Sequence, residues 1–128
     1  MRIIGMGTDI VETLRIAQMI ERHGELFLRR VYTQREIEYC SGRKAATQHY
    51  AGRWAVKEAV LKSLGTGWSR GIQWVDMEVV NDATGRPRLI LDGVALELSR
   101  QMGINEVMIT LSHCRTHATA TALAVGKD

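Results

Sequence analysis

Hydrophobic residues recur with a helical period between positions 50 and 64, in the stretch YAGRWAVKEAVLKSL, and nothing after Gly52 breaks a helix. At about 100° per residue the apolar side chains point in most directions, which is typical of a helix packed on several sides. These side chains are Ala51, Trp54, Ala55, Val56, Ala59, Val60, Leu61 and Leu64. We therefore expect a central helix that lies in the core of the protein.

The same helix carries four charged residues, which are Arg53, Lys57, Glu58 and Lys62. Charges among apolar neighbours are costly unless each meets a counter-charge, a metal or a bound anion. Glu58 and Lys62 are one turn apart and could also form an ordinary helix ion pair worth about 0.2–0.5 kcal/mol. The glycines of GTG at 65–67 end the helix, either as a simple turn or as exposed backbone that can approach a phosphate.

The chain begins with a short predicted strand over residues 2–6, followed by a predicted helix over residues 13–23. Asp9 lies between them, either as a turn residue or as a ligand. The helix is expected to bury Ile16, Ala17 and Ile20 and to end at Gly24.

The other face of this first helix carries Arg15, Met19 and Arg22, and we expect the methionine to be exposed. Two arginines around an adaptable apolar side chain suit an acidic amphipathic helix as a partner, although a plain solvated face has the same pattern. Residues 25–32 predict a second helix, in which Arg29 and Arg30 lengthen the basic surface. Its inward side chains are expected to be Leu26, Phe27 and Val31.

The remaining elements predict an α+β fold in which helices pack against an antiparallel sheet. Thr33 and Glu36 form a capping box that opens a short helix to Cys40, so Glu36 needs no chemical role. After Gly67 the period becomes extended. We expect one hairpin from residues 72–80 and 88–91, a helix over 94–102, and a second hairpin from 107–112 and 118–125. The last strand alternates Ala and Thr, which favours packing against the central helix but also suits a tight subunit interface.

Composition indicates one ordinary globular domain over residues 1–128, with 45% hydrophobic and 24% charged residues. No apolar run is long enough to cross a membrane, and the first residues do not form a signal peptide, so we expect a cytoplasmic protein. Cys40 and Cys114 lie far apart and are expected to be free thiols without zinc.

The formal charge of +3 favours acidic partners such as phosphates, acidic proteins or nucleic acid. Nucleic acid is the least favoured of these, because aromatic residues are few and no nucleic-acid-binding motif is present. A binding module without catalysis and a small nucleic-acid binder are the alternatives to an enzyme. Dependence on a divalent metal would separate the first from an enzyme, and salt-sensitive retention on DNA would favour the second.

Three segments together resemble a known family: GMGTDIVE at 5–12, GRWAVKEAVLKSLGTG at 52–67 and TLSH at 110–113. They are similar to the short, single-domain 4′-phosphopantetheinyl transferases, the holo-(acyl-carrier-protein) synthases of bacterial fatty-acid synthesis. The resemblance spans nearly the whole chain. It implies magnesium-dependent transfer of phosphopantetheine from coenzyme A to a serine of an apo acyl carrier protein, with release of 3′,5′-ADP.

The resemblance also implies roles for individual residues. Asp9 and Glu58 resemble the two carboxylates that hold magnesium, and Lys62 resembles the lysine that contacts the coenzyme A phosphates. Glu58 and Lys62 are the residues expected to act in catalysis, and either Glu58 or a metal-bound water takes the serine proton. The positions expected around the nucleotide are Arg53, Gly65 and His113, with the arginine and histidine often supplied by a neighbouring subunit of a homotrimer. The positions expected to dock the acidic carrier are Arg15, Met19, Arg22 and Arg29.

Three positions depart from the family pattern. Trp54 replaces the more usual Phe, Cys114 stands where Ser or Thr is common, and His117 stands where Tyr is frequent. Ligand contacts from the 114–117 loop are therefore not carried over.

Overall fold

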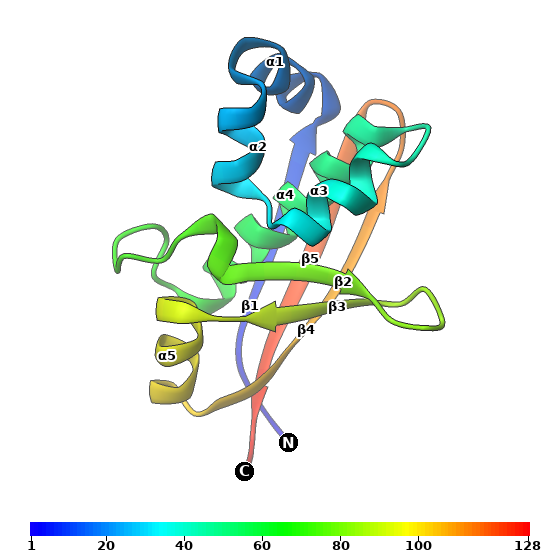
Figure 1. Ribbon diagram of the computed structural model, residues 1–128. Coiled ribbons are helices and arrows are strands. Elements are labelled where there is room, and N and C mark those ends of the chain that lie inside the picture. The colour runs from blue at the N-terminus through cyan, green and yellow to red at the C-terminus, as the bar shows by residue number, and fades with distance from the viewer.

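A three-stranded antiparallel sheet and the helix that lies across it form the centre of the protein (Figure 1). The computed structural model describes residues 1–128. The strands are β1 (Arg2–Glu12), β5 (His117–Gly126) and β4 (Ile104–His113), and β5 lies between the other two. The central helix is α4 (Ala46–Leu64). The two ends of the chain consequently lie together at one end of the sheet (Figure 1).

The other elements surround this centre and confirm the α+β prediction. A second, two-stranded antiparallel sheet follows α4 and is preceded by a short 3-10 turn. The helices are α1 (Thr13–His23), α2 (Glu25–Val31), α3 (Gln34–Ser41) and α5 (Gly93–Gln101), and the remaining elements are η1 (Trp74–Asp76), β2 (Met77–Asn81) and β3 (Pro87–Leu91). No helix is both long enough and apolar enough to cross a bilayer.

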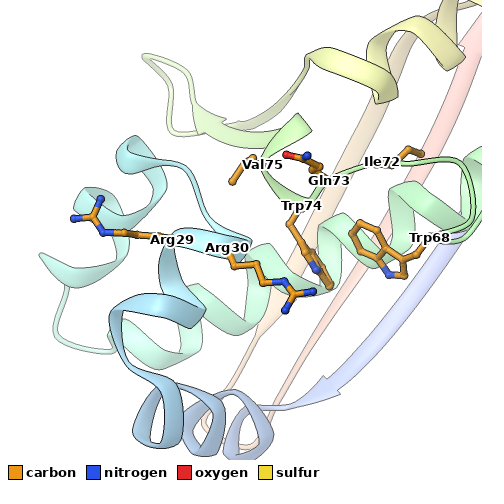
Figure 2. Close-up of a pocket in the computed structure, with 7 residues that line it drawn as sticks. All are labelled: Arg29, Arg30, Trp68, Ile72, Gln73, Trp74 and Val75. Atoms are coloured by element: carbon orange, nitrogen blue, oxygen red, sulfur yellow. The ribbon is translucent and has the colours of Figure 1, made fainter.

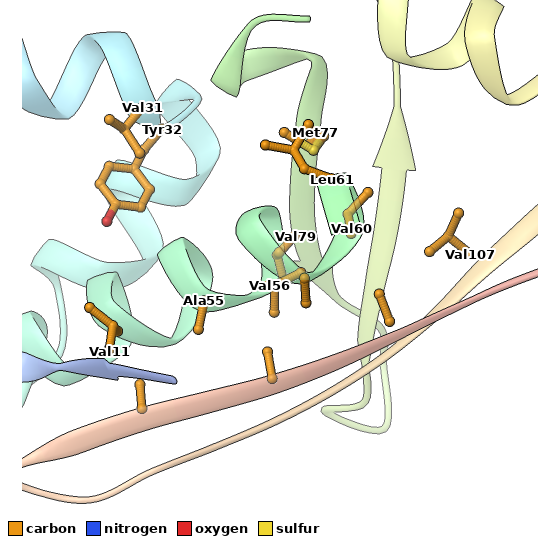
Figure 3. Packing of buried hydrophobic residues seen from close by; sticks show 14 of the residues in the cluster. Val11, Val31, Tyr32, Ala55, Val56, Val60, Leu61, Met77, Val79 and Val107 are labelled. Carbon is orange, nitrogen blue, oxygen red and sulfur yellow. The ribbon is translucent and has the colours of Figure 1, made fainter. Parts of the chain in front are cut away.

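The alternating alanines of β5 face α4 and are buried, whereas the threonines between them are exposed. The buried set is Ala118, Ala120, Ala122 and Ala124. Figure 3 shows Val56 and Val60 of α4 in the same apolar cluster as Val79 and Val107. Packing of the small side chains against the central helix is therefore confirmed.

Two glycines of β1 allow α4 to lie directly on the strand. A Cβ atom added to Gly5 would stand 2.0 Å from the Ser63 carbonyl oxygen, and one added to Gly7 would stand 2.1 Å from the Ala59 carbonyl oxygen. Both distances are far below van der Waals contact. No residue with a side chain fits at either position while α4 keeps its place.

The predicted boundaries of two strands were wrong. β1 does not stop at Met6 but continues through Asp9 to Glu12, because its backbone pairs with β5 along this whole length. The strand predicted from residue 72 begins instead at Met77, because Trp74–Asp76 form the 3-10 turn η1.

The predictions for the first two helices hold in their extent but not for every side chain. Phe27 and Val31 are buried, but Leu26 is 80% exposed, since α2 is short and only one side of it meets the core. Met19 is partly buried and packs against the core, so it is not the exposed residue that the sequence predicted. The two cysteines are free, with Cys40 buried and Cys114 exposed.

Replacement of Gly7 by alanine tests the contact between β1 and α4. We expect Gly7→Ala to lower the free energy of unfolding by about 3 kcal/mol or more, because the new methyl group overlaps the α4 backbone. Urea unfolding measures this value. Gly42→Ala is the control, because its Cβ atom would lie 3.2 Å from the nearest atom, the Glu38 carbonyl oxygen. Equal stability of the two variants would contradict the proposed role of the glycine.

Candidate active site

Asp9, Glu58 and Lys62 lie together where β1 passes α4. The Lys62 ammonium donates hydrogen bonds to the Thr8 carbonyl oxygen at 2.8 Å and to Asp9 Oδ1 at 3.3 Å. Glu58 lies one turn before Lys62 on the same helix, and it is close enough to Asp9 for the two carboxylates to interact. The structure therefore brings together three residues from two motifs that are about 50 residues apart in the sequence.

The pKa of Glu58 is raised above its ordinary value, first by burial and then by the negative charge of Asp9. The positive charge of Lys62, a hydrogen bond from the Trp68 indole and the charge of Arg15 act in the opposite direction. Two neighbouring carboxylates repel each other when both are ionised, so this place favours a cation. The Lys62 ammonium already supplies one positive charge there.

The donor set at this place fits a magnesium ion that also binds phosphate. Magnesium prefers oxygen ligands and is usually held by one or two carboxylates together with substrate phosphates and water. Asp9 and Glu58 offer two carboxylates, and no group of three or more His, Cys, Asp or Glu side chains gathers anywhere in the chain. A magnesium ion held by these two carboxylates would take its other ligands from water and a substrate.

Gly65 ends α4 three residues after Lys62. Its φ of 74° is left-handed, which favours glycine, and its amide donates to the carbonyl oxygens of Leu61 and Lys62. That amide is thus already paired within the helix cap. The predicted end of the helix at Gly65 is confirmed, and the contact of Gly65 with a nucleotide stays a prediction.

Arg53 and His113 lie in a different part of the protein from Asp9, Glu58 and Lys62. The buried Arg53 side chain donates to Asn81 Oδ1 at 3.0 Å, and its guanidinium lies 4.1 Å from the centre of the Tyr39 ring. His113 contacts Gln48 at 3.1 Å. Both residues line a cavity of about 360 Å³, with Tyr39, His49, Asn81, Pro87, Leu111 and Ser112.

The two groups of residues are separated along α4. Arg53 and Lys62 are nine residues apart, which is about 13 Å along the axis and half a turn around it. One phosphate cannot contact both side chains from a single chain without a large rearrangement. On one chain, Arg53 and Lys62 therefore point to opposite sides of α4.

The buried charges on α4 have an explanation that the sequence did not provide. The Lys57 ammonium lies 2.7 Å from Glu36 Oε1, and Arg53 Nε lies 4.0 Å from Glu36 Oε2. The sequence predicted that each charge of this helix would meet a counter-charge, a metal or an anion, and for these two it is a counter-charge. Glu36 was assigned only to the capping box, which is present, but it is also their counter-charge.

The predicted docking residues form a basic surface on α1 and α2. Arg15, Arg22 and Arg29 are exposed, although Arg29 also pairs with Glu25 at 3.1 Å. The Arg15 guanidinium lies 5.7 Å from the centre of the Trp54 ring. This surface combines positive charge with apolar side chains, and Arg15 extends it toward Glu58.

A cavity of about 630 Å³ adjoins this surface, between α2 and the segment that leads into η1 (Figure 2). Its walls include the paired rings of Trp68 and Trp74, whose centres are 4.2 Å apart. The other lining residues are Arg29, Arg30, Ile72, Gln73 and Val75. No pattern in the sequence indicated this cavity, because its two walls come from segments about 40 residues apart.

Comparison with known proteins identifies the family. The 4′-phosphopantetheinyl transferase superfamily matches residues 5–122 of the chain. The chain belongs to this superfamily. The holo-[acyl-carrier-protein] synthase of Geotalea daltonii is 45% identical over 118 residues, which are 92% of this chain and 94% of that protein. The resemblance noted in the sequence and the assignment to an enzyme are thus confirmed.

Solved structures of holo-[acyl-carrier-protein] synthases share the fold of this transferase. That from Neisseria meningitidis has a TM-score of 0.88 and 30% sequence identity, covering 97% of this chain and 99% of its own. That from Bacillus anthracis, in complex with CoA (3′,5′-ADP), has a TM-score of 0.80 and 32% identity, covering 98% of each chain.

Replacement of Asp9 tests whether its carboxylate lies close enough to Glu58 to change the pKa of Glu58. In the metal-free protein we expect Asp9→Asn to lower the pKa of Glu58, because a negative charge that raises it is removed. Lys62→Met should raise the pKa of Glu58, because a positive charge that lowers it is removed. Carbon-detected NMR titration of the Glu58 carboxyl group measures both shifts. A Glu58 pKa that stays the same in Asp9→Asn would show that the side chains are apart.

Proposed function

We propose that this transferase moves the 4′-phosphopantetheine group of coenzyme A to a serine hydroxyl of an apo acyl carrier protein, with magnesium, and releases 3′,5′-ADP. The observation that carries the proposal is the meeting of Asp9, Glu58 and Lys62 at one exposed place. The names of the relatives and the complex of the Bacillus anthracis enzyme with CoA (3′,5′-ADP) support the same reaction.

The reaction forms a bond between the serine oxygen and the pantetheine-side phosphorus, while the bond from that phosphorus to the oxygen of 3′,5′-ADP breaks. Asp9 and Glu58 would hold the magnesium ion, which neutralises charge on the diphosphate oxygens when it is bound. Lys62 adds a second positive charge and orients the phosphates. Either Glu58 or a water on the magnesium ion would accept the serine proton.

We infer that the site is completed by a neighbouring copy of the chain in a homotrimer. Arg53 and Lys62 lie on opposite sides of α4, about 13 Å apart along its axis, and His113 lines the cavity on the Arg53 side. The sheet face opposite α4 exposes Ile3, Met6 and Ile10, which are 61%, 68% and 69% exposed. An apolar sheet face of this kind suits a subunit interface. Such an interface would bring one copy's Arg53 and His113 toward another copy's Lys62.

The acidic carrier protein is proposed to dock on Arg15, Met19, Arg22 and Arg29. Positive charge on α1 and α2, next to apolar side chains, suits an acidic amphipathic partner. Met19 contributes through the part of its side chain that the core leaves open. Participation in fatty-acid synthesis and a cytoplasmic location stay predictions.

Mass spectrometry of an apo carrier protein tests the reaction directly. After incubation with the transferase, coenzyme A and magnesium, we expect the carrier to gain one phosphopantetheine group. Asp9→Asn and Glu58→Gln should each reduce turnover at least about a hundredfold, because each removes a ligand and a charge from the site. Glu97→Gln is the control, since this exposed carboxylate lies on α5, outside the candidate site. A carrier of unchanged mass would refute the proposal.

Reversal of one charge on α1 tests carrier docking. Arg15→Glu should raise the KM for the carrier about tenfold with little change in the KM for coenzyme A, because it repels an acidic partner. Arg100→Glu on α5 provides the same charge change away from the docking surface. Steady-state kinetics with each substrate varied in turn measure the effect. Equal KM values for the carrier in the two variants would exclude Arg15 from docking.

A further inference from the structure

A buried ion pair between α3 and α4 takes no part in the proposed reaction. The side chains of Glu36 and Lys57 have no exposed surface, and Lys57 Nζ lies 2.7 Å from Glu36 Oε1. Lys57 directly precedes Glu58, but adjacent residues of a helix point about 100° apart. The pair therefore lies inside the protein while Glu58 faces the candidate site.

The Lys57 ammonium also holds both walls of the cavity in Figure 2. It donates hydrogen bonds to the carbonyl oxygen of Val31 at 2.6 Å and to that of Trp74 at 3.3 Å. Val31 ends α2 directly after the two arginines of one wall, and Trp74 belongs to the other wall. One side chain of α4 thus ties both walls to the helix that carries Glu58.

The Glu36 carboxylate extends this connection to two more segments. It accepts hydrogen bonds from the Thr33 amide at 2.9 Å and from the Val79 amide at 3.0 Å. These amides belong to the start of α3 and to β2. Together the two side chains link α2, α3, η1 and β2 to α4.

Stability alone does not explain why a charged pair occupies this place. Removing two charges from water is costly, and apolar residues of similar volume are often equally stable or more stable there. Burial lowers the pKa of Lys57 below its ordinary value, even though the Glu36 charge acts in the opposite direction. Unlike an apolar contact, the pair makes directional hydrogen bonds. These bonds hold the neighbouring segments in one orientation as well as close together.

We propose that Glu36 and Lys57 are positioning residues that fix Arg29, the docking arginine of α2, and the Trp74 wall relative to Glu58. This inference rests on the proposed function, because it concerns docking of the carrier. Loss of the pair should loosen α2 and reduce productive use of the carrier. Binding of coenzyme A should change less than use of the carrier, because Arg53, which is proposed to serve the nucleotide, keeps its hydrogen bond to Asn81.

The double substitution Glu36→Gln with Lys57→Met tests the proposal. It removes both charges of the 2.7 Å pair together, and Arg53, which also faces Glu36 at 4.0 Å, keeps its hydrogen bond to Asn81. Both new side chains are close in size to the originals. We expect the double variant to fold, with the KM for the carrier raised about tenfold and the KM for coenzyme A changed less than about twofold. Hydrogen exchange should become faster at the amides of residues 31–33 and 74–76.

Ile104→Ala is the control for a general loss of stability. It creates a cavity in the sheet, at the start of β4, whereas the ion pair lies between α3 and α4. We expect it to leave the KM for the carrier unchanged. If the double variant fails to fold, Glu36→Asp replaces it, because it keeps the charge but draws the carboxylate back from Lys57. The same change in KM, but smaller, is then expected.

Titration of a fluorescent apo carrier separates failure of this inference from failure of the proposed function. Wild-type protein that binds the carrier without modifying it would overturn the proposed reaction, and the inference would then be judged by binding affinity. A double variant, or its Glu36→Asp replacement, with wild-type carrier affinity and KM would overturn the inference alone. An equal rise of the carrier KM in Ile104→Ala would overturn it as well.

Discussion

The direct contact between β1 and α4 is the constraint on which the candidate site depends. Gly5 and Gly7 have no side chains, so the carbonyl oxygens of Ser63 and Ala59 lie against the strand. Alternate residues of a strand share one face, and Asp9 follows the two glycines on the face toward α4. The absence of two side chains therefore lets the Asp9 carboxylate reach Lys62 and, beside it, Glu58.

The charges of α4 divide into two groups with different surroundings. Lys57 and Arg53 are buried and find their counter-charge in Glu36. Glu58 and Lys62 lie where solvent can enter, and the Lys62 side chain is 55% exposed. The second group is the one that solvent reaches, whereas in the first group only Arg53 also lines a cavity. A helix that is apolar on most sides can carry both groups because the first is neutralised inside the protein.

Local patterns predicted the elements better than the contacts between them. The period of residues 13–23 and the capping box at Thr33 marked α1 and α3 correctly, because caps and periodicity are local. The predicted first strand stopped at Met6, between Gly5 and Gly7, whereas packing against α4 explains these two glycines. The partner of Lys57 could not be found because Glu36 already had a local role. The resemblance to a family supplied Asp9, Glu58 and Lys62, and the structure adds that they meet.

The separation of Arg53 and His113 from Lys62 has a consequence for the assembly. Residues that the family resemblance assigns to one nucleotide occupy two distant places in one chain, and an exposed apolar sheet face lies opposite α4. Contact between copies would join two incomplete halves into a whole site. Activity would then depend on protein concentration as well as on the residues of the site.

The central claim is that Asp9 and Glu58 hold one divalent cation together. Anomalous diffraction from crystals grown with Mn²⁺ and coenzyme A tests this most directly, because it locates the metal without reference to activity. The account predicts a peak about 2.0–2.2 Å from an oxygen of each carboxylate, with the diphosphate on its open side. A peak that contacts only one of them, or that lies elsewhere with coenzyme A bound, would contradict the account.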